Sequence, residues 1–403
     1  MDALKVLMLG PGTPNHLNSG LGVAAMHIAD FLSKHVELIL IEPQTGEEQL
    51  QGWDELKHHR FTELHDEWRV ASEIVRINIQ SEINPYHYAE SQSLTTEVEE
   101  VKNELTQVLE EYTHTTIEKI KGISYDLIYA HDWTTLPTAL RLKEETGKPL
   151  VVHFHSLDYD RMAGKDRSWV YDLEQQAVEK ADAIITVSNY SSNILQEHYD
   201  FAMEKVFPIH NGYEAYDKVN STKKVAEDII LFVGRMAEQK GPGIFLEIAA
   251  KVHAQNPNTR FVMAGTGEKQ KELIESGAYQ SFAHKFHFTG HLDKERLQEL
   301  YAISSVYCMP SVSEPFGLSA VEAANAGLPM VLSKQSGAAE VLKGAYTCDH
   351  WEILDFSEKI IDLLSNKKAC KKMIEMNRKS LQSISWENTG HQILEVFNSV
   401  TPK

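Results

Sequence analysis

A chain of 403 residues is too long for one ordinary hydrophobic core and suits two domains of roughly 150–200 residues each. It is 42% hydrophobic and 24% charged, a balance typical of globular proteins, which excludes a disordered chain. The formal net charge of −19 argues against nucleic acid as a partner and against a basic membrane-docking face, although it leaves room for a local basic pocket that binds a diphosphate.

The N-terminal residues predict a first β-strand and not a targeting segment. Residues 1–12 (MDALKVLMLGPG) are apolar for only about six positions, and they lack a basic n-region and a small-residue cleavage site. No run approaches the ~18 apolar residues of a membrane span, so we expect no integral membrane association. Cys308, Cys348 and Cys370 are odd in number and widely spaced, which favours a reducing, cytoplasmic location and neither a disulfide nor a zinc frame.

Short apolar runs alternate with helical patterns along most of the chain. Buried strands that alternate with helices predict parallel sheets covered on both faces, an α/β fold. The predicted strands are residues 5–9, 37–41, 127–130, 150–154, 183–187, 229–233, 260–264, 306–309 and 330–332. The predicted helices include residues 22–34, 94–120, 169–180, 243–254 and 318–325.

The strongest helical pattern lies between Leu94 and Ile120, where apolar residues recur every three or four positions. We interpret it as an amphipathic helix packed on its own domain and not as a coiled-coil partner site. Residues 44–92 are polar and irregular and include Pro85. We expect them to form variable excursions of the first domain, on the acceptor side.

Turn residues and a polar stretch over 208–226 predict a domain boundary. We expect a first domain over 1–207, a second over 208–384, and a C-terminal helix over about 385–403 that packs back on the first domain. Two open α/β domains that face each other place a cleft between the carboxyl ends of their strands, where ligands bind in such sheets.

The segment LFVGRMAEQKG places Arg235 and Lys240 in a loop after the strand at 229–233. A guanidinium can hold two phosphate oxygens at once, and an ammonium five residues further on can reach a second phosphate. The alternative is a pair of solvated side chains on a surface loop, which accounts for most such pairs.

The segment SEPFGLSAVEAANAGLP carries two glutamates, Glu314 just before a predicted helix and Glu322 about one turn inside it. The first turn of this helix offers unpaired N–H groups and the positive end of the helix dipole, which suit a phosphate. One carboxylate would then meet sugar hydroxyls and the other a ribose. For Glu322 alone, a solvated helix position is the simpler interpretation.

The two glutamates eight apart, with PFG between them, resemble the E-x7-E motif of retaining glycosyltransferases of family 4. This resemblance implies the GT-B fold, in which two Rossmann-like domains face a cleft. GRMAEQKG resembles the arginine–lysine diphosphate clamp of that family. The segments NSGLG (18–22), AHDW (130–133), VSNYS (187–191), PIHNGY (208–213), AGTGE (264–268) and GH (290–291) follow in the same order. AHDW and HFHSLDYDR (153–161) resemble the glycogen- and starch-synthase-like branch, whereas NSGLG departs from the K-x-G-G loop of that branch.

The resemblance implies a role for each matched residue. His131, Glu314, Arg235 and Lys240 would be catalytic. His155 and Asp158 would lie on the acceptor side. The residues expected to bind the donor are Gly20, Gly22, Arg235, Lys240, Gly265, Phe316, Gly317, Leu318 and Glu322.

Other interpretations of the same residues remain open. A tight turn without a ligand explains Gly20 and Gly22 equally well, and a core histidine explains His131. His153 and His155 share one strand face, but no carboxylate or cysteine lies at ligand spacing, so we expect no metal site. The glycines at 10–12 and at 265–267 do not complete G-x-G-x-x-G, which disfavours a dehydrogenase.

The resemblance implies a retaining transferase without cofactor or divalent metal. Its partners would be a nucleoside-diphosphate sugar donor and a carbohydrate acceptor, and a hexose, glucose first, would move to a sugar or glucan hydroxyl. A nucleotide-sugar epimerase or a glycosyl phosphorylase can share the fold. A non-catalytic scaffold would be expected to have lost Arg235, Lys240 or Glu314, and this chain keeps all three.

Overall fold

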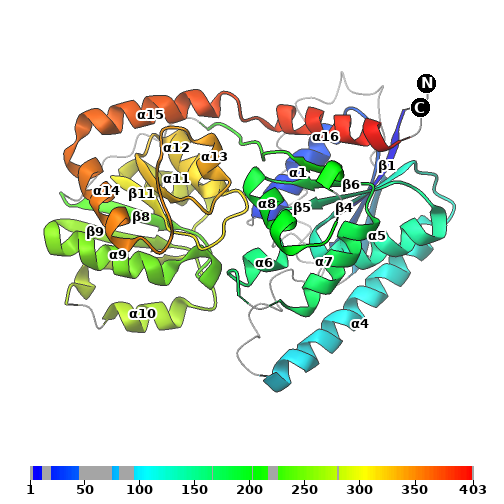
Figure 1. Cartoon of the computed structure of the whole chain (residues 1–403), viewed down its shortest axis with the longest axis horizontal. Coiled ribbons are helices and arrows are strands. Elements are labelled where there is room, and N and C mark those ends of the chain that lie inside the picture. Colours follow the sequence, from blue (N-terminus) through cyan, green and yellow to red (C-terminus); the bar gives the residue numbers. More distant parts are fainter. Residues whose placement is uncertain are drawn as a thin grey trace.

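The computed structural model describes residues 3–10, 20–44, 75–80, 95–165, 167–201, 203–216, 226–278 and 281–401. It contains two parallel β-sheets, each with helices on both faces, that lie side by side (Figure 1). The predicted α/β class with two Rossmann-like sheets is therefore confirmed.

The first sheet has seven strands in the order β3-β2-β1-β4-β5-β6-β7, and every pairing in it is parallel. The strand order runs in opposite directions on the two sides of the β1–β4 pair, so the carboxyl ends of these two strands form a topological switch point. The strands are β1 (Lys5–Leu9), β2 (Glu37–Gln44), β3 (Val75–Gln80), β4 (Leu127–His131), β5 (Leu150–Phe154), β6 (Ala183–Thr186) and β7 (Val206–Pro208).

Helices cover both faces of the first sheet because its strands are apolar on both sides. Leu7 and Leu9 of β1 belong to the core beneath α4, α5 and α7, whereas Val6 and Met8 belong to the core beneath α1 and α16. These helices and two shorter ones are α1 (Gly20–Leu32), α4 (Thr95–Ile120), α5 (Asp132–Thr146), α6 (Asp158–Arg161), α7 (Trp169–Lys180), α8 (Asn189–His198) and α16 (Trp386–Val400).

The second sheet repeats the same winding with six parallel strands in the order β10-β9-β8-β11-β12-β13. Its strands are β8 (Asp228–Val233), β9 (Thr259–Ala264), β10 (Phe286–Gly290), β11 (Val306–Met309), β12 (Met330–Ser333) and β13 (Tyr346–Cys348). Its helices are α9 (Pro242–Gln255), α10 (Gln270–Ala278), α11 (Lys294–Ile303), α12 (Leu318–Ala326), α13 (Ala338–Val341), α14 (Ile353–Ser365) and α15 (Lys367–Leu381). Short 3₁₀ turns lie at Met203–Lys205, Glu238–Lys240 and Ala283–Lys285.

The C-terminal helix α16 leaves the second sheet and lies on the first, above α1 in Figure 1. Trp386 stacks on His27 with ring centroids 4.8 Å apart, and the Phe397 ring lies 4.9 Å from Tyr129 of β4. The chain thus crosses between the two units twice, once before β8 and once after α15. The exact boundary between residues 207 and 208 stays a prediction.

The elements expected from the sequence occur with shifts of a few residues at their ends. The prediction of an irregular segment over 44–92 is wrong in one part, because residues 75–80 form the edge strand β3 beside β2. Three further strands, β7, β10 and β13, escaped prediction. β10 is a short edge strand that alternates buried and exposed residues, and β7 and β13 have three residues each. Residues 45–74 and 81–94 lie outside the described residues.

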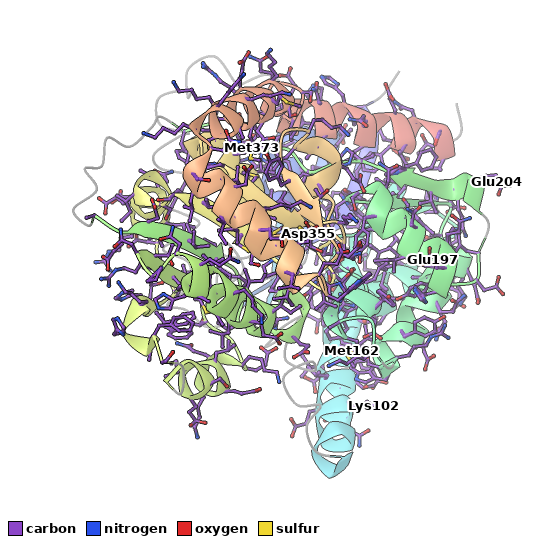
Figure 2. All side chains as sticks on the ribbon, turned by 60° about the vertical axis from the view of Figure 1, so that its left-hand side comes forward. Lys102, Met162, Glu197, Glu204, Asp355 and Met373 are labelled. Carbon is purple, nitrogen blue, oxygen red and sulfur yellow. The ribbon has the colours of Figure 1, made fainter. Side chains whose placement is uncertain are left out.

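Within the described ranges, no helix combines the length and the apolar character that crossing a bilayer requires. The longest one, α4, runs away from the body of the molecule at the end that carries Lys102 (Figure 2). The three cysteines are free, and Cys308 and Cys348 are buried.

The docking of α16 predicts the effect of one substitution. A Cβ added at Gly390 would lie 2.1 Å from Phe31 Cδ1 of α1, so one of the two helices must shift. We expect Gly390→Ala to lower the free energy of unfolding by roughly 1–3 kcal/mol, measured by urea denaturation. Gly243→Ala in α9 is the matched control, because nothing lies within 4 Å of its added methyl group. Equal stability of the two variants would contradict this packing.

Candidate functional site

The loops that follow β6 and β11 meet, which brings the carboxyl ends of both sheets together. The Ser188 hydroxyl donates to the carbonyl oxygen of Pro315 at 2.6 Å, and the hydroxyls of Tyr190 and Ser313 lie 2.9 Å apart. Ligands of open parallel sheets bind at such carboxyl ends. The predicted site residues of the second unit lie around this junction.

Lys240 and Glu314 form an ion pair between the loops after β8 and β11. The ammonium of Lys240 donates to both carboxylate oxygens of Glu314, at 2.8 and 2.7 Å, and only 8% of the Glu314 side chain is exposed. Ser311 donates to the same carboxylate at 3.4 Å. An ammonium has three N–H donors, so one of them stays available for a further oxygen in this geometry. The structure thus joins two of the four residues predicted to be catalytic.

Arg235 lies on the loop after β8, with a guanidinium nitrogen 3.8 Å from a carboxylate oxygen of Glu268. The loop after β9 contacts the loop of Arg235 closely. Gly265 has φ +131°, and a Cβ at this position would lie 2.0 Å from the carbonyl oxygen of Gly234. Only glycine fits both the backbone angle and this contact. Gly265 therefore shapes the loop that carries Arg235, which is a structural reason for its presence at the predicted donor side.

Helix α12 begins at the junction and presents its N-terminus there. Gly317 precedes it with φ +102°, and Phe316 is 3% exposed. From the first unit, a Cβ at Gly20 would lie 3.6 Å from Leu318 Cδ1, so α1 and α12 approach each other. Gly22 is buried in the first turn of α1, and residues 11–19 of the preceding loop lie outside the described residues.

Glu322 has a different partner from Glu314. Its carboxylate accepts a hydrogen bond from the Tyr301 hydroxyl at 3.1 Å, and burial raises its pKa above the usual range of a glutamate. The Tyr216 hydroxyl also donates to the Glu322 backbone carbonyl at 3.1 Å. The two glutamates of the motif thus have separate hydrogen-bond partners, as a division of roles requires.

In the first unit, His131 at the end of β4 lies against His153 of β5 and against His155, the first residue after β5. His131 Nδ1 and His155 Nε2 are 2.9 Å apart, and the Tyr129 hydroxyl lies 2.6 Å from His153 Nδ1. All three rings are buried, and burial keeps the pKa of each well below its usual range, to about 3 for His155. These imidazoles are neutral at pH 7, and His131 Nε2, His153 Nε2 and His155 Nδ1 have no hydrogen-bond partner among the described residues.

This histidine cluster (His131, His153 and His155) is also chemically a candidate for a metal, since its ligand atoms lie within 4.8 Å of one another. The prediction of no metal site rested on His153 and His155 alone and left out His131 of the neighbouring strand β4. The rings are stacked, however, at interplanar angles of 17° and 21°. The nitrogen lone pairs of stacked rings lie in nearly parallel planes, whereas tetrahedral coordination requires lone pairs that converge on one point. Metal binding would require the rings to turn.

Asp132, the third residue of AHDW, fixes the position of both strand ends. It has φ +52°, which is rare for a residue with a Cβ, and it is 3% exposed. Its carboxylate accepts a hydrogen bond from the backbone N–H of His155 at 2.6 Å and from that of Ser156 at 3.3 Å. Burial raises its pKa to about 7. The sequence analysis quoted this residue without a role, and the strained backbone is what points to one.

Asp158 was predicted on the acceptor side, and its carboxylate has partners in the first unit. It accepts hydrogen bonds from the Ser168 N–H at 2.9 Å and from the Ser168 hydroxyl at 2.5 Å. Its own N–H donates to Glu174, which is fully buried and paired with Arg161. The network fixes the turn after β5, so Asp158 has a structural role here, and its contact with an acceptor stays a prediction.

The sequence analysis also missed Asp160, which contacts the donor-side loop from the first unit. The Ser313 hydroxyl donates to the Asp160 carboxylate, which also accepts the Leu157 N–H at 2.8 Å. Burial raises the pKa of Asp160 to about 6. Nothing in the sequence marks this residue, because its partner lies 153 positions away.

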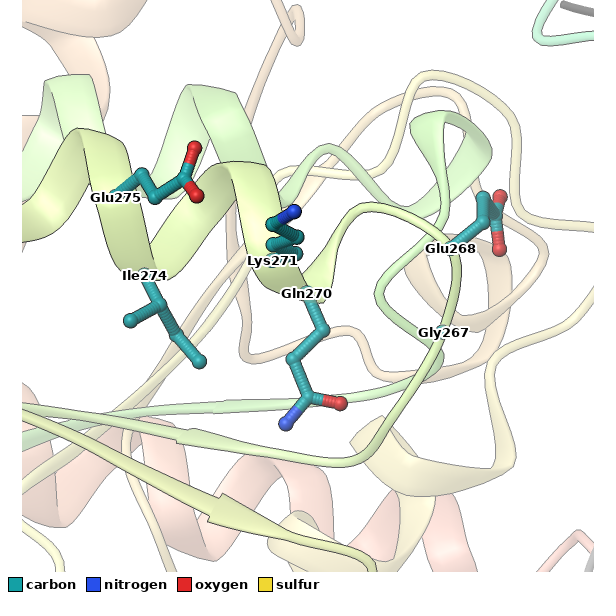
Figure 3. Close-up of a pocket in the computed structure, with 6 residues that line it drawn as sticks. All are labelled: Gly267, Glu268, Gln270, Lys271, Ile274 and Glu275. Carbon is teal, nitrogen blue, oxygen red and sulfur yellow. The ribbon is translucent and has the colours of Figure 1, made fainter.

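An open pocket of about 430 Å³ lies beside Arg235 on the second unit (Figure 3). Gly267, Glu268, Gln270, Lys271, Ile274 and Glu275 line it. All six come from the loop after β9 and from α10, so this pocket belongs to the rim of the second unit and not to the junction of the two sheets.

Comparisons with known proteins agree with this geometry. Residues 215–380 match the family of glycosyl transferases group 1, and residues 107–215 match glycosyltransferase family 4. An uncharacterized glycosyltransferase of Methanocaldococcus jannaschii is 31% identical over 248 residues, which are 56% of this chain and 63% of the relative. Glycogen synthase of Mycobacterium tuberculosis is 26% identical over 286 residues, 68% of each chain.

The chain belongs to the family 4 glycosyltransferases. These are retaining enzymes with the GT-B fold that use nucleotide-sugar donors. The structure of HepE from Anabaena in complex with UDP and glucose shares the fold, with a TM-score of 0.71 and 18% identity over 98% of this chain and all of that one. Its family places this chain among the nucleotide-sugar-dependent glycosyltransferases.

The buried histidines predict how stability depends on pH. Because the pKa of His155 is lowered in the folded state, the unfolded chain takes up its proton first, and stability is lost as pH falls below ~6.5. We expect the stability advantage of the parent over His155→Gln to shrink by about 2 kcal/mol between pH 7.5 and 5.0. Urea unfolding of both proteins at each pH measures this difference in stability. The comparison isolates His155, because the raised carboxyl pKa values of Asp132 and Asp160 affect the stability of both proteins equally. A difference independent of pH would contradict a buried neutral His155.

Proposed function

We propose that this transferase moves a hexose, glucose first, from a nucleoside-diphosphate sugar to a hydroxyl of a sugar or glucan, without a divalent metal. The observation that carries the proposal is the convergence of Lys240, Glu314 and the N-terminus of α12 where the loops of both sheets meet. Similarity to glycogen synthase supports a glucosyl donor and a glucan acceptor. HepE was solved with UDP and glucose, which makes UDP-glucose the first donor to test.

In this proposal the second unit neutralises the diphosphate. Arg235 and the remaining N–H of Lys240 bind its oxygens, and the backbone N–H groups after Gly317 add the positive end of the α12 dipole. Negative charge grows on the leaving phosphate as the glycosidic bond breaks, so cations fixed in advance stabilise the transition state more than the ground state. The leaving phosphate helps to take the acceptor proton, and the acceptor attacks from the same face.

Glu314 and the histidine cluster would hold the transferred sugar. Lys240 orients the Glu314 carboxylate, whose two oxygens have lone pairs left to accept hydrogen bonds from sugar hydroxyls. His131 would lie toward the anomeric carbon and His155 toward the acceptor. Glu322 would bind the ribose. No residue is assigned as a nucleophile, so rate enhancement rests on positioning and electrostatics.

Removal of either cation tests the diphosphate assignment. We expect Arg235→Ala and Lys240→Ala each to lower kcat/KM by about 100- to 1,000-fold, the usual effect of losing one group that stabilises developing charge. Lys271→Ala, an exposed lysine of α10, is the control. Values within about threefold of the parent would show that the two cations do not bind the leaving group.

A donor panel identifies the nucleotide and the sugar. UDP-, ADP- and GDP-sugars are added to the protein, and the shift of its unfolding midpoint is measured. A ligand at 100 times its Kd adds about 2.7 kcal/mol of stability, so we expect a clear shift with UDP-glucose or ADP-glucose. The anomeric configuration of the product, read by NMR, should match that of the donor. Turnover that depends on inorganic phosphate would instead reveal a phosphorylase.

A further inference from the structure

Helix α8 of the first unit is capped by a carboxylate of the second unit. The N–H groups of Asn189 and Tyr190 donate to Glu340 at 3.0 and 2.6 Å, and the Asn189 side-chain amide donates at 2.9 Å. His210 Nε2 lies 2.8 Å from the same carboxylate. Glu340 is about 150 residues from α8 in sequence, so these bonds form only when the two units are together.

The chemistry of this contact favours an ionised Glu340. Burial alone would raise its pKa, but the hydrogen bonds from His210 and Asn189 outweigh burial and lower it. A carboxylate at a helix N-terminus pairs with both the free N–H groups and the positive end of the dipole. The side chain keeps 22% of its surface exposed, so water can replace these bonds when the units separate.

The same helix start also contacts the loop that carries Glu314. Ser188 donates to the Pro315 carbonyl and Tyr190 contacts Ser313, so both sequence neighbours of Glu314 are bound to α8. The fit is close here, because a Cβ at Gly337 would lie 2.7 Å from Ser188 Cβ. A movement that carries Glu340 away from the start of α8 therefore also disturbs the contacts of Ser313 and Pro315 with the first unit.

We propose that Glu340 is a positioning residue that latches the second unit to the N-terminus of α8, so that the site closes around the donor and must unlatch to release the nucleotide. This latch (Glu340 with Asn189, Tyr190 and His210) does not touch the reacting atoms. It acts through Ser313 and Pro315 on the placement of Glu314. The inference goes beyond the proposed function, because it depends neither on the sugar nor on the acceptor.

Glu340→Gln tests the latch with little change in shape, and Glu358→Gln, an exposed acid on α14, is its matched control. Amide hydrogen exchange of free protein is measured over residues 188–192. We expect exchange in Glu340→Gln to rise at least about tenfold there, because the charged acceptor of two amides is lost, and to stay as in the parent elsewhere in the first sheet. The radius of gyration from X-ray scattering should also increase.

Binding of UDP links the latch to the site. A ligand that requires the closed state binds more weakly in proportion to the fraction of closed molecules, so we expect the UDP Kd of Glu340→Gln to rise about tenfold. Because donor binding drives closure, saturating UDP should restore the parent scattering curve. Failure of UDP to bind parent and control alike would exclude a uridine nucleotide as the donor and leave the exchange result to decide the latch.

Asn189→Ala approaches the same contact from the other unit and covers the case in which Glu340→Gln folds poorly. It removes only the side-chain donor to Glu340, so we expect a smaller rise of exchange at the start of α8. Its effect should be non-additive with that of Glu340→Gln, as for residues in direct contact. Unchanged exchange and unchanged scattering in both variants would overturn the proposal.

Discussion

The ion pair between Lys240 and Glu314 is the contact on which the arrangement of the site depends. It joins the loop after β8 to the loop after β11, and it pairs the Lys240 ammonium with the buried carboxylate of Glu314. A buried charge without a partner is strongly unfavourable, so the two loops cannot take positions independent of one another. The cation expected to meet a diphosphate and the acid expected to meet a sugar are thus set at a fixed separation by their own attraction.

The rest of the second unit supports this pair through backbone contacts. The loop after β9 is locked to the loop of Arg235 by the approach of Gly265 to Gly234. The loop after β11 is anchored by the Glu314 N–H, which donates to Gln335, and by the Gly337 N–H, which donates to the Glu314 carbonyl. Parallel sheets place such loops together because all strands end at the same edge, and glycines let the loops approach within van der Waals contact.

The sequence was sufficient for the elements and motifs whose signal is local. Buried runs such as residues 150–154, which are apolar except for His153, were predicted at their observed bounds, whereas the edge strands β3 and β10 have weaker patterns. The histidine cluster unites strands 24 positions apart, and Asp160 meets Ser313 across 153 positions. Sequence spacing carries no information on such pairs, because the register of strands and the closure of the two units decide them.

The two units differ in the charge of the side chains that they bring to the junction. Burial keeps the three clustered histidines neutral, and the buried Arg161 is paired with Glu174, so these groups of the first unit bring no net positive charge to the junction. Arg235, Lys240 and the α12 dipole all come from the second unit. In the proposed function, a charged diphosphate would therefore favour the second unit, while neutral hydroxyl groups would suit the imidazoles of the first. Transfer would then require the binding groups of both units in one closed site. The contact between the two units would therefore be as important for activity as the side chains that each unit supplies.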